Sequence, residues 1–320
     1  MRIRRMAVLV LWWSVSLLIS DSSGAAPICE GGVQLDNYAS KRILLAQDTL
    51  FFKTSDIQLD IDGSPSAYGV QDQGFEDICN GLGPLQPPQC RGKVQGPCYA
   101  ACQAAFRNWN GDLQTLGQRM CSIGLGGGGC STPNVRLQQP PRQQWFVSET
   151  TVRVVPPSGI SVAAWIKTQP AQLDSTEIPY FVISGGFRRQ PWDATPGDAG
   201  VVVEQTTGKQ VAFIVGDVGG SLNEGSAKLL AELAGINTLP ARAKTNAFGV
   251  LVQRLQGAKN GDFRVAIFRH TAPLLPSEQR GQASVLNQTA ENLPAWIRDT
   301  VHERIQSIGG PTRVIGCTSP

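Results

Sequence analysis

Histidine is rare in this 320-residue chain, which contains only His270 and His302. A catalytic triad built on histidine and a metal site with several histidine ligands are therefore nearly excluded. Both histidines have an ordinary interpretation, since His302 lies in a polar, helix-like stretch and His270 ends an expected strand. We expect neither of them to carry chemistry.

The chain also lacks a basic run and any interleaving of basic with aromatic residues, the pattern typical of nucleic-acid binding. Its 28 Lys and Arg residues exceed its 25 Asp and Glu residues by a formal net charge of only +3. Three of the arginines and Asp21 fall within the first 25 residues, so the remaining chain carries +1. A nucleic-acid partner is therefore not expected.

No hydrophobic run is long enough for a confident membrane span, because the apolar stretch Met6–Ile19 is too short. This stretch follows three arginines and precedes the small residues Ser22–Ala26, which is the pattern of a signal peptide and its cleavage zone. We therefore expect residues 1–25 to be a signal peptide. The mature protein is expected to be secreted or periplasmic, without membrane attachment.

Cysteine, by contrast, is plentiful, and an even number in an exported chain favours disulfide bonds. The eight cysteines are Cys29, Cys79, Cys90, Cys98, Cys102, Cys121, Cys130 and Cys317. Six of them lie between residues 79 and 130, which predicts a disulfide-rich, partly helical insertion over residues 78–142. Eight cysteines allow 105 pairings, so the connectivity stays open; Cys317 is a candidate partner of Cys29 or of the insertion.

Neither a metal nor a cofactor is expected. Cys98 and Cys102 have the spacing of a zinc ligand pair, but no second pair and no nearby histidine completes the site. The glycine run Gly124–Gly129 lacks the preceding strand and the following lysine of a phosphate-binding loop, so we interpret it as a linker.

The rest of the chain is rich in expected strands and has no internal repeat or alternating strand–helix series. The expected strands are Thr49–Lys53, Asp56–Asp62, Trp145–Val147, Thr151–Val155, Val162–Ile166, Ile178–Ser184, Val201–Glu204, Gln210–Val215, Phe248–Arg254 and Arg264–His270. The fold class is therefore α+β and β-dominated. Residues 26–77 and 143–275 would form the two parts of the β core, and residues 276–320 a tail with an amphipathic helix.

Three acids share one face of the expected strand Asp56–Asp62, opposite its apolar residues. Asp56, Asp60 and Asp62 would repel one another on that face. A solvated edge or a cation site would explain them, but a cleft that binds a cationic ligand explains them better. A calcium loop is disfavoured because the 12-residue spacing that ends in Glu is missing.

Two further acids lie between an expected strand and an expected helix in Val201–Gly235. Asp217 follows Gly216, and Glu224 lies seven residues later on what we predict to be a glycine-rich loop. Such a pair is suited to acid–base catalysis. The structural alternative, a turn aspartate and a first-turn helix glutamate, is favoured by this stretch alone.

Taken together, three separated pieces of the sequence resemble the glycoside hydrolase family 75 chitosanases. They are Leu50–Gly63 with its LDIDG, Ile178–Gly185 (IPYFVISG), and Val201–Ala234 with a Gly-Lys turn, GDVGG, and NEGS before an apolar helix. The resemblance covers the core, and the last piece is also similar to double-psi β-barrel proteins. Two features depart from the family pattern: Asn223 replaces a glycine, and the spacer before Glu224 is short.

The resemblance implies a six-stranded double-psi-like β-barrel core and a chitosanase-like activity, the inverting hydrolysis of a β-1,4-linked amino-sugar polymer by a monomer. Asp217 and Glu224 would then be the catalytic base and acid, in roles that could be exchanged. Asp60, Asp62, Tyr68 and Asn223 would contact the polysaccharide, and Trp145 or Trp192 would be further stacking candidates. The alternatives are an exported protein that binds glycan, including peptidoglycan, without cutting it, and an inhibitor or adhesion module built on the insertion.

Overall fold

The computed structural model describes residues 29, 32–70, 74–75, 78, 104–106, 109–120, 135–139, 145–189, 191–236, 244–245, 251–252, 260–281 and 283–318. The expected signal peptide, most of the cysteine-rich insertion and most of the expected strand Phe248–Arg254 lie outside these residues.

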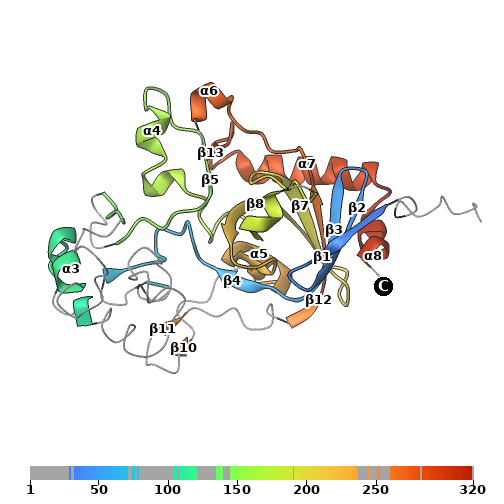
Figure 1. The fold of residues 1–320 in the computed structure, drawn as a ribbon, viewed down its shortest axis with the longest axis horizontal. Coiled ribbons are helices and arrows are strands. Elements are labelled where there is room, and N and C mark those ends of the chain that lie inside the picture. Colours follow the sequence, from blue (N-terminus) through green and yellow to red (C-terminus); the bar gives the residue numbers. More distant parts are fainter. Residues whose placement is uncertain are drawn as a thin grey trace, which may run out of the picture.

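The described chain is built around one nine-stranded sheet (Figure 1). Its strands, in spatial order, are β1 (Val33–Tyr38), β2 (Lys41–Ala46), β3 (Thr49–Asp56), β12 (Asn260–Phe268), β7 (Ala199–Glu204), β8 (Gln210–Gly219), β6 (Tyr180–Ser184), β9 (Glu224–Ser226) and β4 (Gln58–Asp60). Two small sheets pair β5 (Val152–Arg153) with β13 (Ser284–Val285) and β10 (Lys244–Thr245) with β11 (Leu251–Val252).

The β-dominated mixed class is as expected, but the sheet is open. Most neighbouring strands are antiparallel, whereas β6 with β8 and β4 with β9 are parallel pairs. The edge strands β1 and β4 do not pair with each other within the described residues, so a closed six-stranded barrel is not observed.

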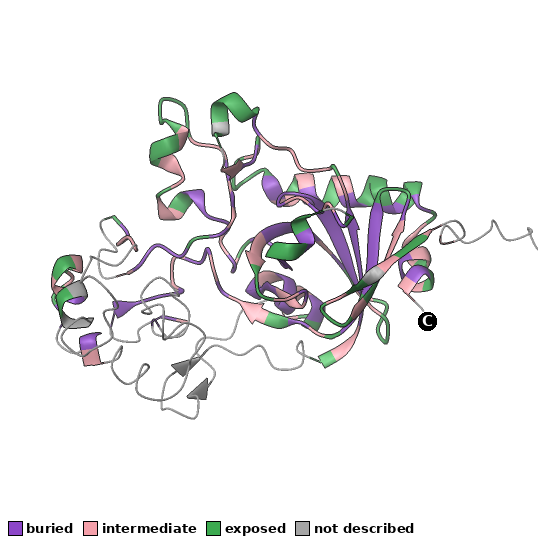
Figure 2. Cartoon of the chain, in the orientation of Figure 1, coloured by how far each residue is buried: buried purple, intermediate pink, exposed green. Residues whose placement is uncertain are grey.

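Helices α5 (Ala227–Ala234), α7 (Leu293–Ser307) and α8 (Pro311–Thr318) cover the two faces of the sheet. Helices α3 (Leu113–Met120), α4 (Val162–Trp165) and α6 (Ser277–Arg280) lie away from it (Figure 1). The 3₁₀ turns are η5 (Gln169–Ala171) and η6 (Gly185–Arg188). Helix α5 packs in one core cluster, and α7 and α8 pack in the other. Between these helices the central strands β6, β7, β8 and β12 are mostly buried, whereas the edge strands β1 and β4 and the outer helix faces are partly exposed (Figure 2).

Helix α5 begins and ends as its sequence predicts. The Ser226 hydroxyl caps the helix by accepting a hydrogen bond from the Leu229 amide, and Gly235 ends it in the left-handed conformation, with φ of 71°. The tail helix is also confirmed as α7, which buries Leu293 and Ile297 against the domain, together with Val301 and Ile305.

The expected strand Val162–Ile166 is wrong, because Val162–Trp165 forms the short helix α4 and Ile166 is its C-cap. The Ser161 hydroxyl accepts a hydrogen bond from the Ala164 amide and so caps a helical turn. This cap and the two alanines outweigh the β-propensity of Val162 and Ile166, which have no strand partner in the structure. The expected strand Trp145–Val147 forms only isolated bridges, from Trp145 to Gly69 and from Phe146 to Leu137.

A disulfide joins Cys29 to Cys317 across 288 residues, so one of the two pairings considered for Cys317 is present. It ties the start of the described chain to α8 and fits the expectation of an oxidising compartment. None of the helices in the described part of the chain is both long and apolar enough to cross a membrane.

Candidate active site

A β-bulge decides where Asp217 points. Along the parallel pair β6–β8, Phe181 lies opposite Val215, but the next residue, Val182, lies opposite Asp217, so Gly216 is an extra residue. In a regular strand without the bulge, Asp217 would lie two residues after Val215 and would share its face, inside the core cluster that α5 covers. The bulge therefore turns the carboxylate to the opposite face, which Val182 occupies.

Glu224 reaches the same face from the other neighbour of β6. It lies opposite Val182 in the antiparallel pair β6–β9, so Asp217 and Glu224 flank one valine. A Cβ atom added to Gly219 would lie 2.8 Å from Glu224 Oε2. The glutamate side chain therefore leans over β8, toward the strand that carries Asp217, and only glycine leaves room for it.

Both acids thus belong to strands, and the expected glycine-rich loop between them shrinks to the turn that joins β8 to β9. Within this turn the Ser221 hydroxyl donates a hydrogen bond of 2.8 Å to Glu224 Oε1.

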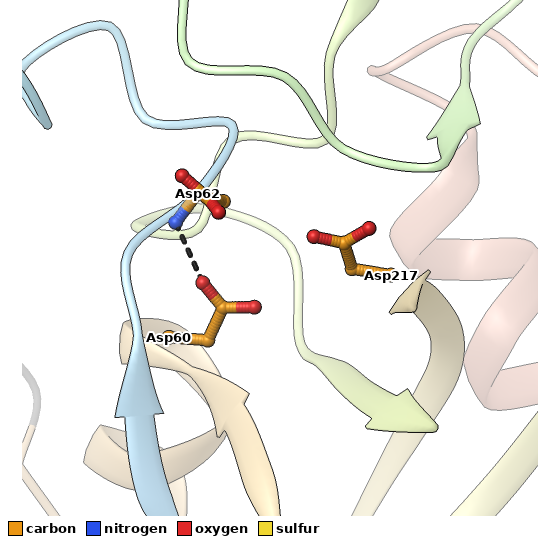
Figure 3. Close-up of side chains that lie close together, drawn as sticks. All are labelled: Asp60, Asp62 and Asp217. Atoms are coloured by element: carbon orange, nitrogen blue, oxygen red, sulfur yellow. Dashed lines mark hydrogen bonds between the residues drawn. The ribbon is translucent and has the colours of Figure 1, made fainter. Parts of the chain in front are cut away.

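Strand β4 carries Asp60, and the turn that follows it carries Asp62, so this part of the chain adds two more carboxyl groups. The strand runs parallel to β9, with Gln58 opposite Glu224 and Asp60 opposite Ser226. Oxygen atoms of Asp60, Asp62 and Asp217 all lie within 4.8 Å of one another. Figure 3 shows the Asp217 carboxylate pointing from β8 toward the other two, so residues 155 positions apart in sequence form one cluster.

Buried groups fix the backbone beneath Asp60 and Asp62. The Ser175 hydroxyl donates to the Asp60 carbonyl at 2.6 Å, and the Tyr180 hydroxyl donates to the Asp62 carbonyl at 2.7 Å. The Asp62 amide in turn donates to Asp60 Oδ1 at 2.9 Å. The turn that presents the two acids is therefore held in one conformation.

A third segment, Ser148–Thr151, contacts both Asp62, after β4, and Asp217, on β8. The Ser148 hydroxyl donates to Asp62 Oδ1 at 2.9 Å. The amide and hydroxyl of Thr151 donate to Asp217 Oδ1 at 2.8 and 2.6 Å. The sequence carries no signal for these contacts, because they span 86 and 66 residues and depend on the folded arrangement.

The crowding of carboxyl groups changes their proton affinities. Burial, followed by repulsion from Asp62 and Asp217, raises the pKa of Asp60 well above its ordinary value. Burial and then the charge of Asp217 raise the pKa of Glu224, although the Ser221 hydroxyl opposes that rise. Mutual repulsion of this kind works against stability and is typical of functional sites, where neighbouring like charges shift pKa values.

The predicted site residues are thus brought together in part. Tyr68 is only 2% exposed, so its ring offers no stacking face, and its hydroxyl donates to Asp62 Oδ1 at 2.7 Å. Asn223 donates its amide to Asp56 at 2.8 Å. Trp192 is buried and stacks on Phe187, so it belongs to the core.

The three clustered aspartates also have the oxygen chemistry that hard divalent cations prefer. Six to eight oxygen ligands are usual for calcium, so the three carboxylates would supply only part of such a shell. The same arrangement equally suits an amine-bearing ligand, and the expectation that no metal is needed remains a prediction.

A cavity of about 1210 Å³ adjoins this cluster through Gly63, the residue after Asp62. Its wall includes the side chains of Gln138 and Gln169 and the carboxyl residues Asp174 and Glu177. Its wall includes neither the three clustered aspartates nor Glu224, and most of it is apolar, with residues such as Val147, Val154 and Ile178.

No protein-family model matches this sequence, and no curated protein matches it. The resemblance to chitosanases therefore rests on the quoted motifs, and function has to be argued from the arrangement of the carboxyl groups.

Proposed function

We propose that this protein is a chitosanase-like glycoside hydrolase that cleaves a β-1,4-linked amino-sugar polymer with inversion. The observation that carries the proposal is the placement of Asp217 and Glu224 on the two strands that flank Val182, on one face of the sheet. Two carboxyl groups on either side of a scissile bond are what glycoside hydrolysis requires.

The spacing supports inversion. Strands lie about 4.8 Å apart, so the backbones of β8 and β9, one on each side of β6, are separated by about 9.6 Å. Because Glu224 leans over Gly219 toward β8, its carboxyl group lies closer to β8 than the separation of the two backbones. Inverting enzymes hold their carboxyl groups about 6.5–9.5 Å apart, which leaves room for a water molecule.

The environments support the assignment of roles. The raised pKa of Glu224 favours a carboxyl group that keeps its proton and gives it to the leaving oxygen. Asp217 accepts three hydrogen bonds at Oδ1, from the amide and hydroxyl of Thr151 and from the Val218 amide. These donors fix the orientation of the carboxylate, as the positioning of a base that activates water requires.

The substrate class follows from charge. Asp60 and Asp62 add two carboxyl groups beside the proposed catalytic pair, and Asp174 and Glu177 line the adjoining cavity. Protonated amines of a chitosan-like polymer would reduce the repulsion among these acids. The polymer would extend along the cavity, which supports cleavage within the chain.

The departures from the family pattern are compatible with this arrangement. Asn223 lies in the bend just before β9, and its side-chain amide binds Asp56, outside the carboxyl cluster. A short spacer suffices because β8 and β9 are both neighbours of β6. We also propose that β4, β6, β8 and β9, with their mixed parallel and antiparallel pairing, belong to a double-psi-like barrel of six strands.

The test is to incubate purified mature protein with chitosan, chitin oligomers and peptidoglycan and to measure new reducing ends. Cleavage of chitosan is expected, with the α-anomer appearing first by ¹H NMR. Appearance of the β-anomer first would contradict inversion. Saturable binding without any new reducing ends would instead support the alternative of an exported glycan-binding protein.

A further inference from the structure

The segment Ser148–Thr151 connects the two halves of the carboxyl cluster, although it contributes no acid to the cluster itself. The Ser148 hydroxyl accepts a hydrogen bond from the Gly63 amide at 3.0 Å and donates one to Asp62 at 2.9 Å. Three residues later, Thr151 holds Asp217. The segment therefore fixes an acid from the β4 turn and an acid from β8 relative to each other.

The hydrogen bonds to Asp217 converge on one oxygen. Oδ1 accepts from the Thr151 amide at 2.8 Å, the Thr151 hydroxyl at 2.6 Å and the Val218 amide at 2.7 Å. A carboxylate oxygen offers about two lone-pair directions, so three donors saturate Oδ1. A new hydrogen bond, such as one from a water molecule, is left to Oδ2.

The segment is itself anchored away from the carboxyl groups. The Thr150 amide donates to Gln172 Oε1 at 3.0 Å, and the Ser148 amide donates to Gln169 Oε1 at 2.9 Å. Thr150 also donates its hydroxyl to the Val152 carbonyl at 2.7 Å. Because these anchors do not involve Asp217, they hold Thr151 in place independently of its contact with the carboxylate.

We propose that Thr151 is a positioning residue that saturates Oδ1 of Asp217 and so presents Oδ2 as the oxygen that takes the proton from the attacking water. This inference rests on the proposed function, and it goes beyond it by naming the reacting oxygen and the residue that selects it. In the step, Asp217 Oδ2 gains a proton from the water, and the water oxygen bonds to the anomeric carbon while the bond from that carbon to the glycosidic oxygen breaks. The glycosidic oxygen keeps the electron pair of that bond and gains the proton of Glu224.

The test compares Thr151→Val, which keeps the shape and the amide but removes the hydroxyl, with Thr151→Ser, which restores it. The valine variant is expected to lower kcat about ten- to a hundred-fold, with KM changed less than about threefold, because the lost bond is to a charged group in the reacting state. The pH–rate profiles of both variants are recorded alongside. Serine is expected to restore kcat to within about threefold of the wild type.

Thr207→Val is the matched control. Thr207 donates its amide to Glu204 at 2.8 Å and its hydroxyl to the same oxygen, in the hairpin at the far end of β8. This variant loses the same kind of bond outside the site, and its kcat and pH profile are expected to match those of the wild type.

Three results would overturn the inference. The first is a Thr151→Val enzyme that resembles Thr207→Val in kcat and pH profile. The second is a serine variant that does not recover. If Thr151→Val fails to fold by circular dichroism, Thr151→Ala takes its place, and wild-type kinetics there is the third. Wild-type protein that cleaves none of the glycans is a separate outcome, since it overturns the proposed function and this role of Thr151 with it.

Discussion

Asp198 and the half-buried acids around Asp217 illustrate two different uses of a carboxylate in this fold. Asp198 is fully buried before β7 and accepts backbone hydrogen bonds from the amides of Thr195, Thr271 and Ala272, at 2.8 to 3.1 Å. It joins the loop after β12 to the start of β7. The acids around Asp217 instead lie beside one another, and their charges add to the cost of ionising Asp60 and Glu224. The first arrangement joins two segments of the backbone, whereas the second gathers acids whose charges repel.

The carboxyl cluster is where the largest effect is expected. Asp217→Asn and Glu224→Gln remove the proposed base and acid with almost no change in shape. Each is expected to lower kcat about a thousand-fold on chitosan, because general acid–base groups contribute about 10²- to 10⁴-fold. The measurement is reducing-end production under saturating polymer, with the melting temperature of each variant recorded alongside.

Full activity in both carboxamide variants would contradict the catalytic assignment. Asp193→Asn serves as a control of equal chemistry, because Asp193 forms an ion pair of 3.2 Å with Arg269, outside the cluster. Its activity is expected to stay close to that of the wild type.

Asp198 is expected to act on stability rather than on activity. Burial raises its pKa from 3.8 to about 6, although three backbone amides oppose the rise. A raised folded-state pKa means that the stability contribution is present below about pH 4 and is lost as the pH rises through 6. The size of the loss is about 3 kcal/mol, from about two pKa units.

The measurement is urea unfolding of wild type and Asp198→Asn at pH 4, 5, 6 and 7. At pH 4 both proteins carry a neutral side chain, and their free energies of unfolding should agree closely. By pH 7 the variant is expected to be more stable by about 3 kcal/mol, because it has no charge to bury. Parallel curves across this range would show that Asp198 is stabilised as an anion by its three amide donors.

The sequence predicted the features that depend on neighbouring residues, but not those that depend on long-range contacts. Local signals succeeded: Ser226 and Gly235 mark the ends of α5, and the apolar alternation around Ile57 and Ile61 marks buried positions. Gly216 was also visible, but as a loop residue rather than a bulge. A glycine within a strand allows both interpretations, and only the pairing of β6 with β8 decides between them.

The candidate site was predictable for its acids and not for its supports. Asp60, Asp62, Asp217 and Glu224 stand in recognisable motifs, so all four could be named from the sequence. The contacts that place them are long-range, and residues such as Thr151 lie in stretches with no distinctive pattern. For the same reason the sequence left Tyr68 as a stacking candidate, although its burial beneath Asp62 makes it a support.

The smallest expected effect concerns the cost of crowding at Asp60. Asp60→Asn removes one ionisable group from the cluster. Because the pKa of Asp60 is raised in the folded protein, the wild type loses stability as the pH rises above the ordinary pKa of an aspartate. The variant is expected to gain free energy of unfolding at pH 7, and to show a higher KM for chitosan but a smaller change in kcat than the catalytic variants. Asp56→Asn is the matched control, since Asp56 lies four residues earlier and binds Asn223 and Gln58 instead of the cluster. It should gain no stability. An Asp60→Asn protein that is less stable than the wild type at pH 7 would contradict this expected cost of crowding, because it would mean that the hydrogen bonds to the Asp60 carboxylate outweigh the repulsion from its neighbours.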